Sequence, residues 1–164
     1  MVRGKCMKLL NSQQTNQSFE VTIIMHIKKV ETNEERQAVY NVRKTVFVDE
    51  QKVPEELEID EFEETAIHFI GYEQDEPIAA SRLRLFTNYG KLERIAVKKE
   101  YRGQSIGSNI IRVMEDEIVA YHINEVILNA QTHATGFYES LGYEVFSKQF
   151  MDAGIPHVSM VKKL

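Results

Sequence analysis

A loop with two glycines and an arginine is the stretch of this sequence whose residue types point most directly to chemistry. It contains Arg102, Gly103, Gln104, Ser105, Ile106, Gly107 and Ser108. Residues 92–97 before it predict a strand, and the apolar spacing from Ile106 to Ile118 predicts a helix after it. A strand, a glycine-containing loop and a helix N-terminus form an anion site, because free N–H groups and the helix dipole favour negative charge. The loop therefore predicts a grip on the pyrophosphate of a cofactor.

The elements that must position this loop alternate between strands and short helices. Strands are predicted at residues 19–28, 67–72, 78–86, 91–97, 125–130, 143–150 and 155–161. A first helix is expected to begin after Thr32, a polar cap followed by acids, and to carry an apolar stripe from Val39 to Phe47. Two further helices are predicted at residues 106–121 and 132–141.

Hairpins dominate the first half of this order, and a strand–helix–strand crossover occupies its centre. The arrangement predicts an α/β fold of the mixed α+β type, with a mostly antiparallel sheet of six to seven strands flanked by helices. It disfavours a Rossmann domain, which needs a run of βαβ units. We expect one domain at residues 19–164, preceded by a polar, disordered tail at residues 1–18.

The composition is that of an acidic globular protein. The net charge of -5 and the pI of about 5.6 argue weakly against nucleic acid as a partner, because phosphate binding needs a basic surface. The single cysteine, Cys6, excludes a disulfide within the chain and fits a reducing compartment. Because the sequence has no long apolar run and no signal peptide, we expect a cytoplasmic protein without a membrane partner.

Several motifs together resemble the GNAT superfamily of acetyl-CoA-dependent N-acetyltransferases. The loop is similar to the superfamily's Arg/Gln-x-x-Gly-x-Gly/Ala motif, and residues 95–97 and 137–143 match its flanking segments. The ElaA-like branch is suggested by residues 42–51 and by Pro54, Glu58, Asp60, Ala66 and His68. The predicted order of strands and helices is also the one that this superfamily shows.

The resemblance implies an acetyl transfer from acetyl-CoA to a primary amine by direct attack. It places the cofactor's pyrophosphate on the loop and its pantetheine arm along the backbone of Ile95, Ala96 and Val97. Gln131 stands where the family often has an asparagine that contacts the cofactor. Tyr138 falls at the family's usual position for the general acid that protonates the leaving thiolate. No metal is implied.

One residue of the loop departs from the family pattern. Ser105 stands where the motif has its first glycine. A serine fits there if its φ is negative, and its hydroxyl could bond a phosphate oxygen. If the position needs a positive φ, the serine costs energy.

The base that deprotonates the amine is predicted from the strand before the loop. Glu93 is the best candidate, because strand periodicity places it on one face with Ile95 and Val97. His68 and His133 are alternatives whose usual pKa suits the task. An enzyme without a dedicated base is a further alternative.

A run of acidic residues is the last candidate for function. Residues 55–64 contain seven acids, which would attract a cationic amine or polyamine, or would simply form a solvated loop. Arg82 and Arg84, predicted on one strand face, would meet a substrate carboxylate or pair with this run.

Two rival functions and the state of assembly stay open at this point. A coenzyme A-binding regulatory module without turnover is the non-enzyme alternative, and Ser105 is the residue that most favours it. Acylation of a protein amine is the enzyme alternative. Edge strands near the C-terminus leave room for a homodimer.

Overall fold

The computed structural model describes residues 25–164. The predicted tail at residues 1–18 and the first six residues of the predicted first strand lie outside this part. The strands are β1 (Met25–Lys29), β2 (Ile67–Glu73), β3 (Glu76–Leu85), β4 (Gly90–Val97), β5 (Glu125–Gln131), β6 (Glu144–Val145), β7 (Phe150–Asp152) and β8 (Ile155–Lys163). The helices are α1 (Asn33–Arg43), the π-helix η1 (Lys44–Glu50), α2 (Glu55–Glu58), η2 (Lys99–Tyr101), α3 (Ile106–Ala120), η3 (Thr132–Ala134) and α4 (Thr135–Glu139).

The strands form one mixed sheet with neighbours in the order β1-β2-β3-β4-β5-β8-β6, and β7 also pairs with β8. Among the strands of the described residues, β4 and β5 run parallel and the other pairs are antiparallel. The crossover between the parallel pair is α3, because parallel neighbours need a long connection. The predicted mixed, mostly antiparallel sheet flanked by helices is therefore confirmed.

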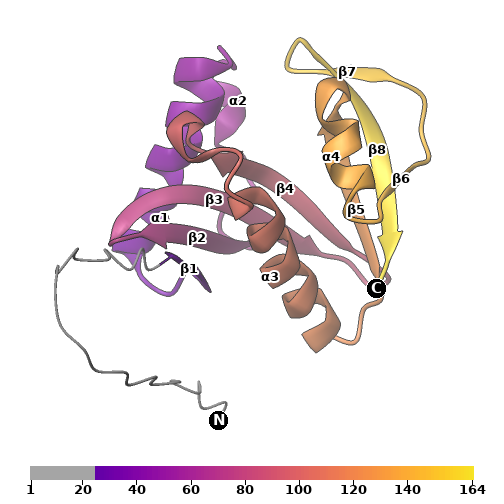
Figure 1. Cartoon of the computed structure of the whole chain (residues 1–164), viewed down its shortest axis with the longest axis horizontal. Helices are drawn as coiled ribbons and strands as arrows, with labels where there is room; N and C mark the ends of the chain where they lie inside the picture. Colours follow the sequence, from indigo (N-terminus) through magenta and orange to yellow (C-terminus); the bar gives the residue numbers. More distant parts are fainter. Residues whose placement is uncertain (1–24) are drawn as a thin grey trace, which may run out of the picture.

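Helices cover the two faces of this sheet, and each face has its own apolar core (Figure 1). The core beneath α3 contains Ile110, Met114 and Leu92, and the core beneath α1 contains Val39 and Ala96. At roughly 25 cal/mol per Å2 of apolar surface removed from water, these two layers supply the main force that holds the helices on the sheet.

The first helix begins where the sequence predicts. The Thr32 hydroxyl accepts from the Glu35 N–H, and the Glu35 carboxylate accepts from the Thr32 N–H, which makes a full capping box. The apolar stripe continues into η1, where Val46 is buried. The change from α-helix to π-helix inside this stripe was not predicted.

One predicted strand is wrong in its extent. Residues 143–150 do not form a continuous strand, because only β6 pairs with β8 before the chain leaves the sheet and returns as β7. Val145 and Phe146 are exposed, so this edge lacks the one-sided burial that would fix a long register. Within residues 25–164 the sheet consequently has eight strands rather than six or seven.

Candidate active site

A bulge in β4 creates the geometry of the site. Arg82 faces Glu93 across the β3–β4 pair, yet Ala80 faces Ala96, so β4 carries one extra residue. That residue lies at Arg94, whose φ is +53°. Such a bulge bends the strand and reverses the face on which later side chains lie.

The bulge overturns the prediction that Glu93 shares a face with Ile95 and Val97. Ile95 and Val97 pack against the core under α3, whereas Glu93 points with Arg82 to the other face. The period of two on which that prediction depends is broken between these residues. Ala96 accordingly lies buried in the core under α1.

Beyond the bulge, β4 and β5 separate. Their ladder covers only Gly90–Leu92 against Val126–Leu128, so the later part of β4 has no strand partner on that side. A cavity of about 500 Å3 opens there, lined among others by Ile95, Val97, Arg102, Gln131, His133 and Tyr138.

The loop at residues 102–108 lies at the end of β4 and leads into α3. Gly103 has a φ of +78°, and an added Cβ would meet nothing within 4 Å, so backbone conformation rather than space favours glycine there. Ser105 has a φ of +62°. The serine therefore occupies the conformation in which it costs energy, and its hydroxyl makes no cap to the helix.

The first turn of α3 presents unpaired donors. Asn109 is the residue whose N–H donates back to the Ser105 carbonyl, at 3.0 Å. The N–H groups of Ile106, Gly107 and Ser108 precede it and have no carbonyl within the helix to bond. These groups, together with the helix dipole, make the end of the cavity suitable for an anion.

Arg102 is held by partners at both ends of its guanidinium. Its Nε donates to the Val97 carbonyl at 2.9 Å, and its Nη1 and Nη2 bind the Glu50 carboxylate at 2.6 and 2.7 Å. The hydrogen bonds from Arg102 hold the pKa of Glu50 below its usual value. Glu50, at the end of η1, was not recognised in the sequence, because the contact joins residues 52 positions apart.

Tyr138 lies on the cavity wall, in α4. Its ring stands edge-on to Phe137 and Tyr143, with centroids 5.0 and 6.0 Å away. Burial raises the pKa of Tyr138 to about 12. The phenol is therefore protonated at neutral pH. Nearby, the Gln131 amide donates to Gln51 at 2.8 Å, which ties β5 to the residue that follows η1.

The three candidates for the base, Glu93, His133 and His68, lie in different environments. Burial alone would raise the pKa of Glu93, but Arg82 and Lys91 outweigh it and lower that pKa. His133 lines the cavity. His68 is not among the lining residues and lies buried on β2, with Nε2 donating to the Glu63 carbonyl at 2.9 Å.

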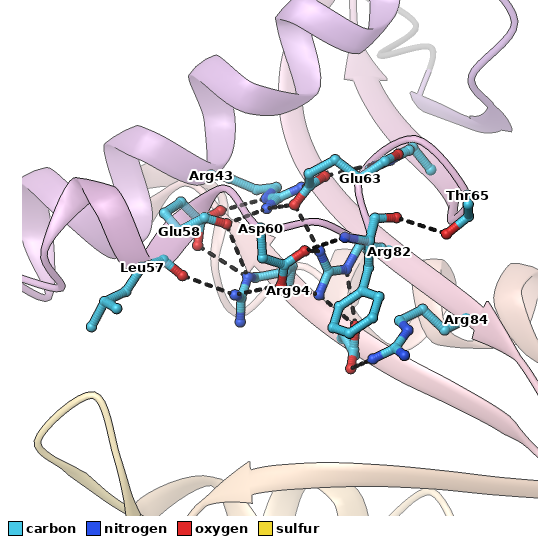
Figure 2. Close-up of polar contacts among 12 residues, drawn as sticks. Arg43, Leu57, Glu58, Asp60, Glu63, Thr65, Arg82, Arg84 and Arg94 are labelled. Atoms are coloured by element: carbon cyan, nitrogen blue, oxygen red, sulfur yellow. Dashed lines mark hydrogen bonds and ion pairs between the residues drawn. The ribbon is translucent and has the colours of Figure 1, made fainter.

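A network of buried charges lies beneath Glu93 (Figure 2). We call it the arginine network, and its members are Arg43, Arg82, Arg84, Lys91, Arg94, Glu58, Asp60, Glu63 and Glu93. Arg82, 1% exposed, binds Asp60 at 2.6 Å and Glu63 at 2.7 Å. The network ties the acidic run to α1 and to the sheet.

The acidic run at residues 55–64 is neither wholly a solvated loop nor wholly a surface for a cationic amine. Four acids, Glu55, Glu56, Glu61 and Glu64, are exposed as a solvated loop would have them. Glu58, Asp60 and Glu63 instead turn inward and pair with arginines. Arg82 pairs with this run, and the Arg84 guanidinium lies 3.4 Å from the Phe62 ring centroid. The pairing of Arg82 with this run was one of the two expectations for that arginine, whereas the pairing of Arg43 with Glu58 and Glu63 was not predicted.

Other cavity residues were also missed by sequence reasoning. Phe47 reaches the cavity from η1, and Asp152 and His157 reach it from the β7–β8 hairpin. The apolar stripe gave a signal for Phe47, but the hairpin residues carried none. Within residues 25–164, no three His, Cys, Asp or Glu side chains gather as a metal site would require. No helix in this part is long and apolar enough to cross a membrane.

Comparisons with known proteins place this geometry in a family. A model of the acetyltransferase (GNAT) domain matches residues 28–164. The Bacillus subtilis protein named as the uncharacterised N-acetyltransferase YjcF is 46% identical over 132 residues, which cover 79% of this chain and 94% of that relative.

Two solved structures and a second relative show the same similarity. A Lactobacillus plantarum protein assigned as an N-acetyltransferase superposes with a TM-score of 0.81 at 27% identity, covering 85% of this chain and 98% of the other. Escherichia coli ElaA is 28% identical over 134 residues, which cover 77% of this chain and 86% of ElaA, and its crystal structure has a TM-score of 0.76. The chain therefore belongs to the GNAT family of acetyltransferases, as an ElaA-like member.

Proposed function

We propose that the protein transfers an acetyl group from acetyl-CoA to a primary amine by direct attack. The observation that carries this proposal is the separation of β4 from β5, which opens a cavity beside the free N–H groups of α3. Acetyl-CoA supplies the acetyl group as a thioester, which an amine attacks without a covalent enzyme intermediate. Cys6, the single cysteine, lies outside the described residues, so no thiol nucleophile is found in the part of the chain that the structure describes.

The cavity walls fit the elongated shape of this cosubstrate. Gly103, Gln104 and Ser105, with the first turn of α3, would hold its pyrophosphate through backbone N–H groups. The edge of β4 from Ile95 to Val97, which has no strand partner on the β5 side, would bind the pantetheine amides in the manner of an added strand. The Gln131 amide, which faces the same cavity, would bind the arm from β5.

Tyr138 is proposed as the general acid. Because its pKa of about 12 keeps the phenol protonated, it can donate a proton to the sulfur as the bond to the acetyl carbon breaks. The raised pKa keeps the proton on the phenol but makes it a weaker donor, since general acids work best with a pKa near the working pH.

Glu93 is proposed as the base, acting through water. Its lowered pKa makes it a weak base, since general bases work best with a pKa near the working pH. His133 is the alternative on the cavity wall. Loss of the ascending limb of the pH–rate profile in Glu93→Gln, but not in His133→Gln, would assign the role to Glu93.

Ser105 favours a second function, a coenzyme A-binding module without turnover. Its φ of +62° strains the loop that would hold the cofactor. A weaker or misplaced grip on the pyrophosphate would leave binding without efficient transfer.

Thiol release with acetyl-CoA and a panel of amines separates the two functions. Release with at least one amine supports the enzyme, whereas tight coenzyme A binding without release from any amine supports the module. Gly107→Glu should abolish coenzyme A binding by calorimetry, since it brings a carboxylate to the helix N-terminus. Gly107→Ala is the matched control, because a Cβ there meets Phe137 at 3.3 Å and needs only a small shift. Unchanged affinity in Gly107→Glu would overturn the cofactor site.

A further inference from the structure

Arg94 occupies the bulge of β4 and lines the cavity. Its left-handed backbone is unusual for a residue with a long side chain, and such outliers gather where a side chain must be aimed. Its side chain is 27% exposed, in contrast to the 2% of Arg82. The bulge therefore brings one guanidinium of the arginine network into contact with the cavity.

Existing partners fix the Arg94 guanidinium without using all its donors. Its Nη2 donates to the Leu57 carbonyl at 3.1 Å and lies 3.5 Å from Asp60, and its Nε lies 3.2 Å from the Glu58 carboxylate. Its Nη1, which carries two N–H groups, has no partner within residues 25–164. Figure 2 shows this guanidinium at the edge of the network, away from Glu63. It is held in place with two donors free.

The charge balance of the arginine network also favours an anion. Its five cations exceed its four carboxylates by one. Every carboxylate contacts at least two cations, as Glu58 contacts Arg43 and Arg94. No acid of this network is left to receive an ammonium group, so any attraction for a polyamine is confined to the exposed acids of the run, Glu55, Glu56, Glu61 and Glu64.

One acidic residue of the cavity wall favours the opposite charge. Asp152, at the end of β7, lines the cavity and forms no ion pair within the described part of the chain. It is exposed on a hairpin, whereas Arg94 is fixed by three neighbouring residues. A fixed group loses less side-chain entropy on binding, which makes Arg94 the stronger determinant.

We propose that the acceptor is an amine that also carries an anionic group, a carboxylate or a phosphate, which Arg94 Nη1 binds. This inference rests on the proposed acetyl transfer and names its substrate class. Arginine suits either anion, because its planar donors match their paired oxygens. Arg94 acts here as a specificity residue and takes no part in proton transfer.

Matched pairs of amines test the proposal with the full chain and saturating acetyl-CoA. Thiol release is measured with β-alanine and its neutral amide, with phosphoethanolamine and ethanolamine, and with spermidine. We expect kcat/KM to be at least about tenfold higher for an anionic member than for its neutral partner, the size of a charge-assisted hydrogen bond. The first pair reports carboxylate recognition and the second reports phosphate recognition.

Variants then test whether Arg94 causes the preference for anionic amines. Arg94→Gln should bring the ratio in each preferred pair close to one without changing coenzyme A affinity, and Arg94→Lys should restore part of it. Asp152→Asn is the control and should leave the ratio unchanged. Release without preference for the anionic members in the unmodified protein overturns this proposal alone, whereas no release from any amine overturns the proposed function as well. A preference for spermidine that Asp152→Asn removes also overturns it.

Discussion

The two charged sides of the cavity, the 102–108 loop and the arginine network, differ in the groups they use and in whether those groups are already paired. The 102–108 loop and the first turn of α3 present backbone N–H groups that precede the first helical hydrogen bond, at Asn109. The arginine network instead uses side chains, and each of its carboxylates already has two or more cationic partners. The first side is therefore prepared for a ligand, and the second is mainly satisfied by the protein itself.

This difference separates binding chemistry from structural chemistry. Backbone donors at a helix end have no side-chain entropy to lose, so leaving them without a bound anion costs little free energy. Buried charged side chains must instead be paired within the protein, because an unpaired charge in the interior is strongly destabilising. Arg94 lies where the two meet, since the bulge exposes part of an otherwise buried network.

The largest expected effect comes from breaking the network at its centre. Arg82→Met leaves Asp60, Glu63 and Glu93 without their shared cation, and we expect the free energy of unfolding to fall by about 3–5 kcal/mol. Urea denaturation measures it. Arg84→Met is the control, because Arg84 is more exposed and binds Glu93 only at 3.5 Å. Equal losses in both variants would show that the network is not centred on Arg82.

Tyr138→Phe removes the proposed proton donor and little else, since no hydrogen bond to the protein is found for its phenol among the described residues. We expect kcat to fall by about 100-fold, within the range for general acid catalysis, with coenzyme A affinity unchanged. Tyr143→Phe is the contrast, because Tyr143 donates to Glu115 at 2.7 Å and should affect stability rather than kcat. An unaltered kcat in Tyr138→Phe would make this residue structural.

A smaller effect on stability is expected from lowering the pH, through the buried His68 beside Glu63. Burial lowers the pKa of His68 from its ordinary 6.5, so below that pH the unfolded chain takes up a proton that the folded chain does not. Stability should therefore fall as pH falls from 6.5 toward the folded pKa, by up to ~1.4 kcal/mol per pH unit. Urea denaturation at pH 7.5 and 5.5 should show this loss in the unmodified protein but not in His68→Gln. His26→Gln, at an exposed site, should keep the full loss.

The smallest expected effect lies in the loop. Ser105→Gly relieves a left-handed serine, and we expect a gain in stability of about 0.5–1 kcal/mol after the entropy of the unfolded glycine is counted. Ser108→Gly, inside the helix, should instead lose a similar amount. Two losses in thermal or urea unfolding would contradict the strain assigned to Ser105.

Local features of the sequence were sufficient to predict much of the fold. The Thr32 capping box, the period of α3 and the apolar run of β5 each determine an element within a few residues of chain. The 102–108 loop was equally predictable, because a helix N-terminus makes an anion site through its own backbone. The strand at residues 143–150 failed, since an edge with little burial gives no one-sided pattern to fix it.

Only the tertiary structure determined how the charged residues are used. Arg43, Glu58 and Arg82 are distant in sequence, and their pairing depends on α1, the acidic run and β3 meeting at one point. The face of Glu93 depended on a single extra residue at Arg94, which sequence periodicity does not reveal. The sequence by itself thus determined the elements and the 102–108 loop with its helix N-terminus, because those follow from nearest neighbours. Long-range pairing and one bulge determined the arginine network and the exposure of Arg94.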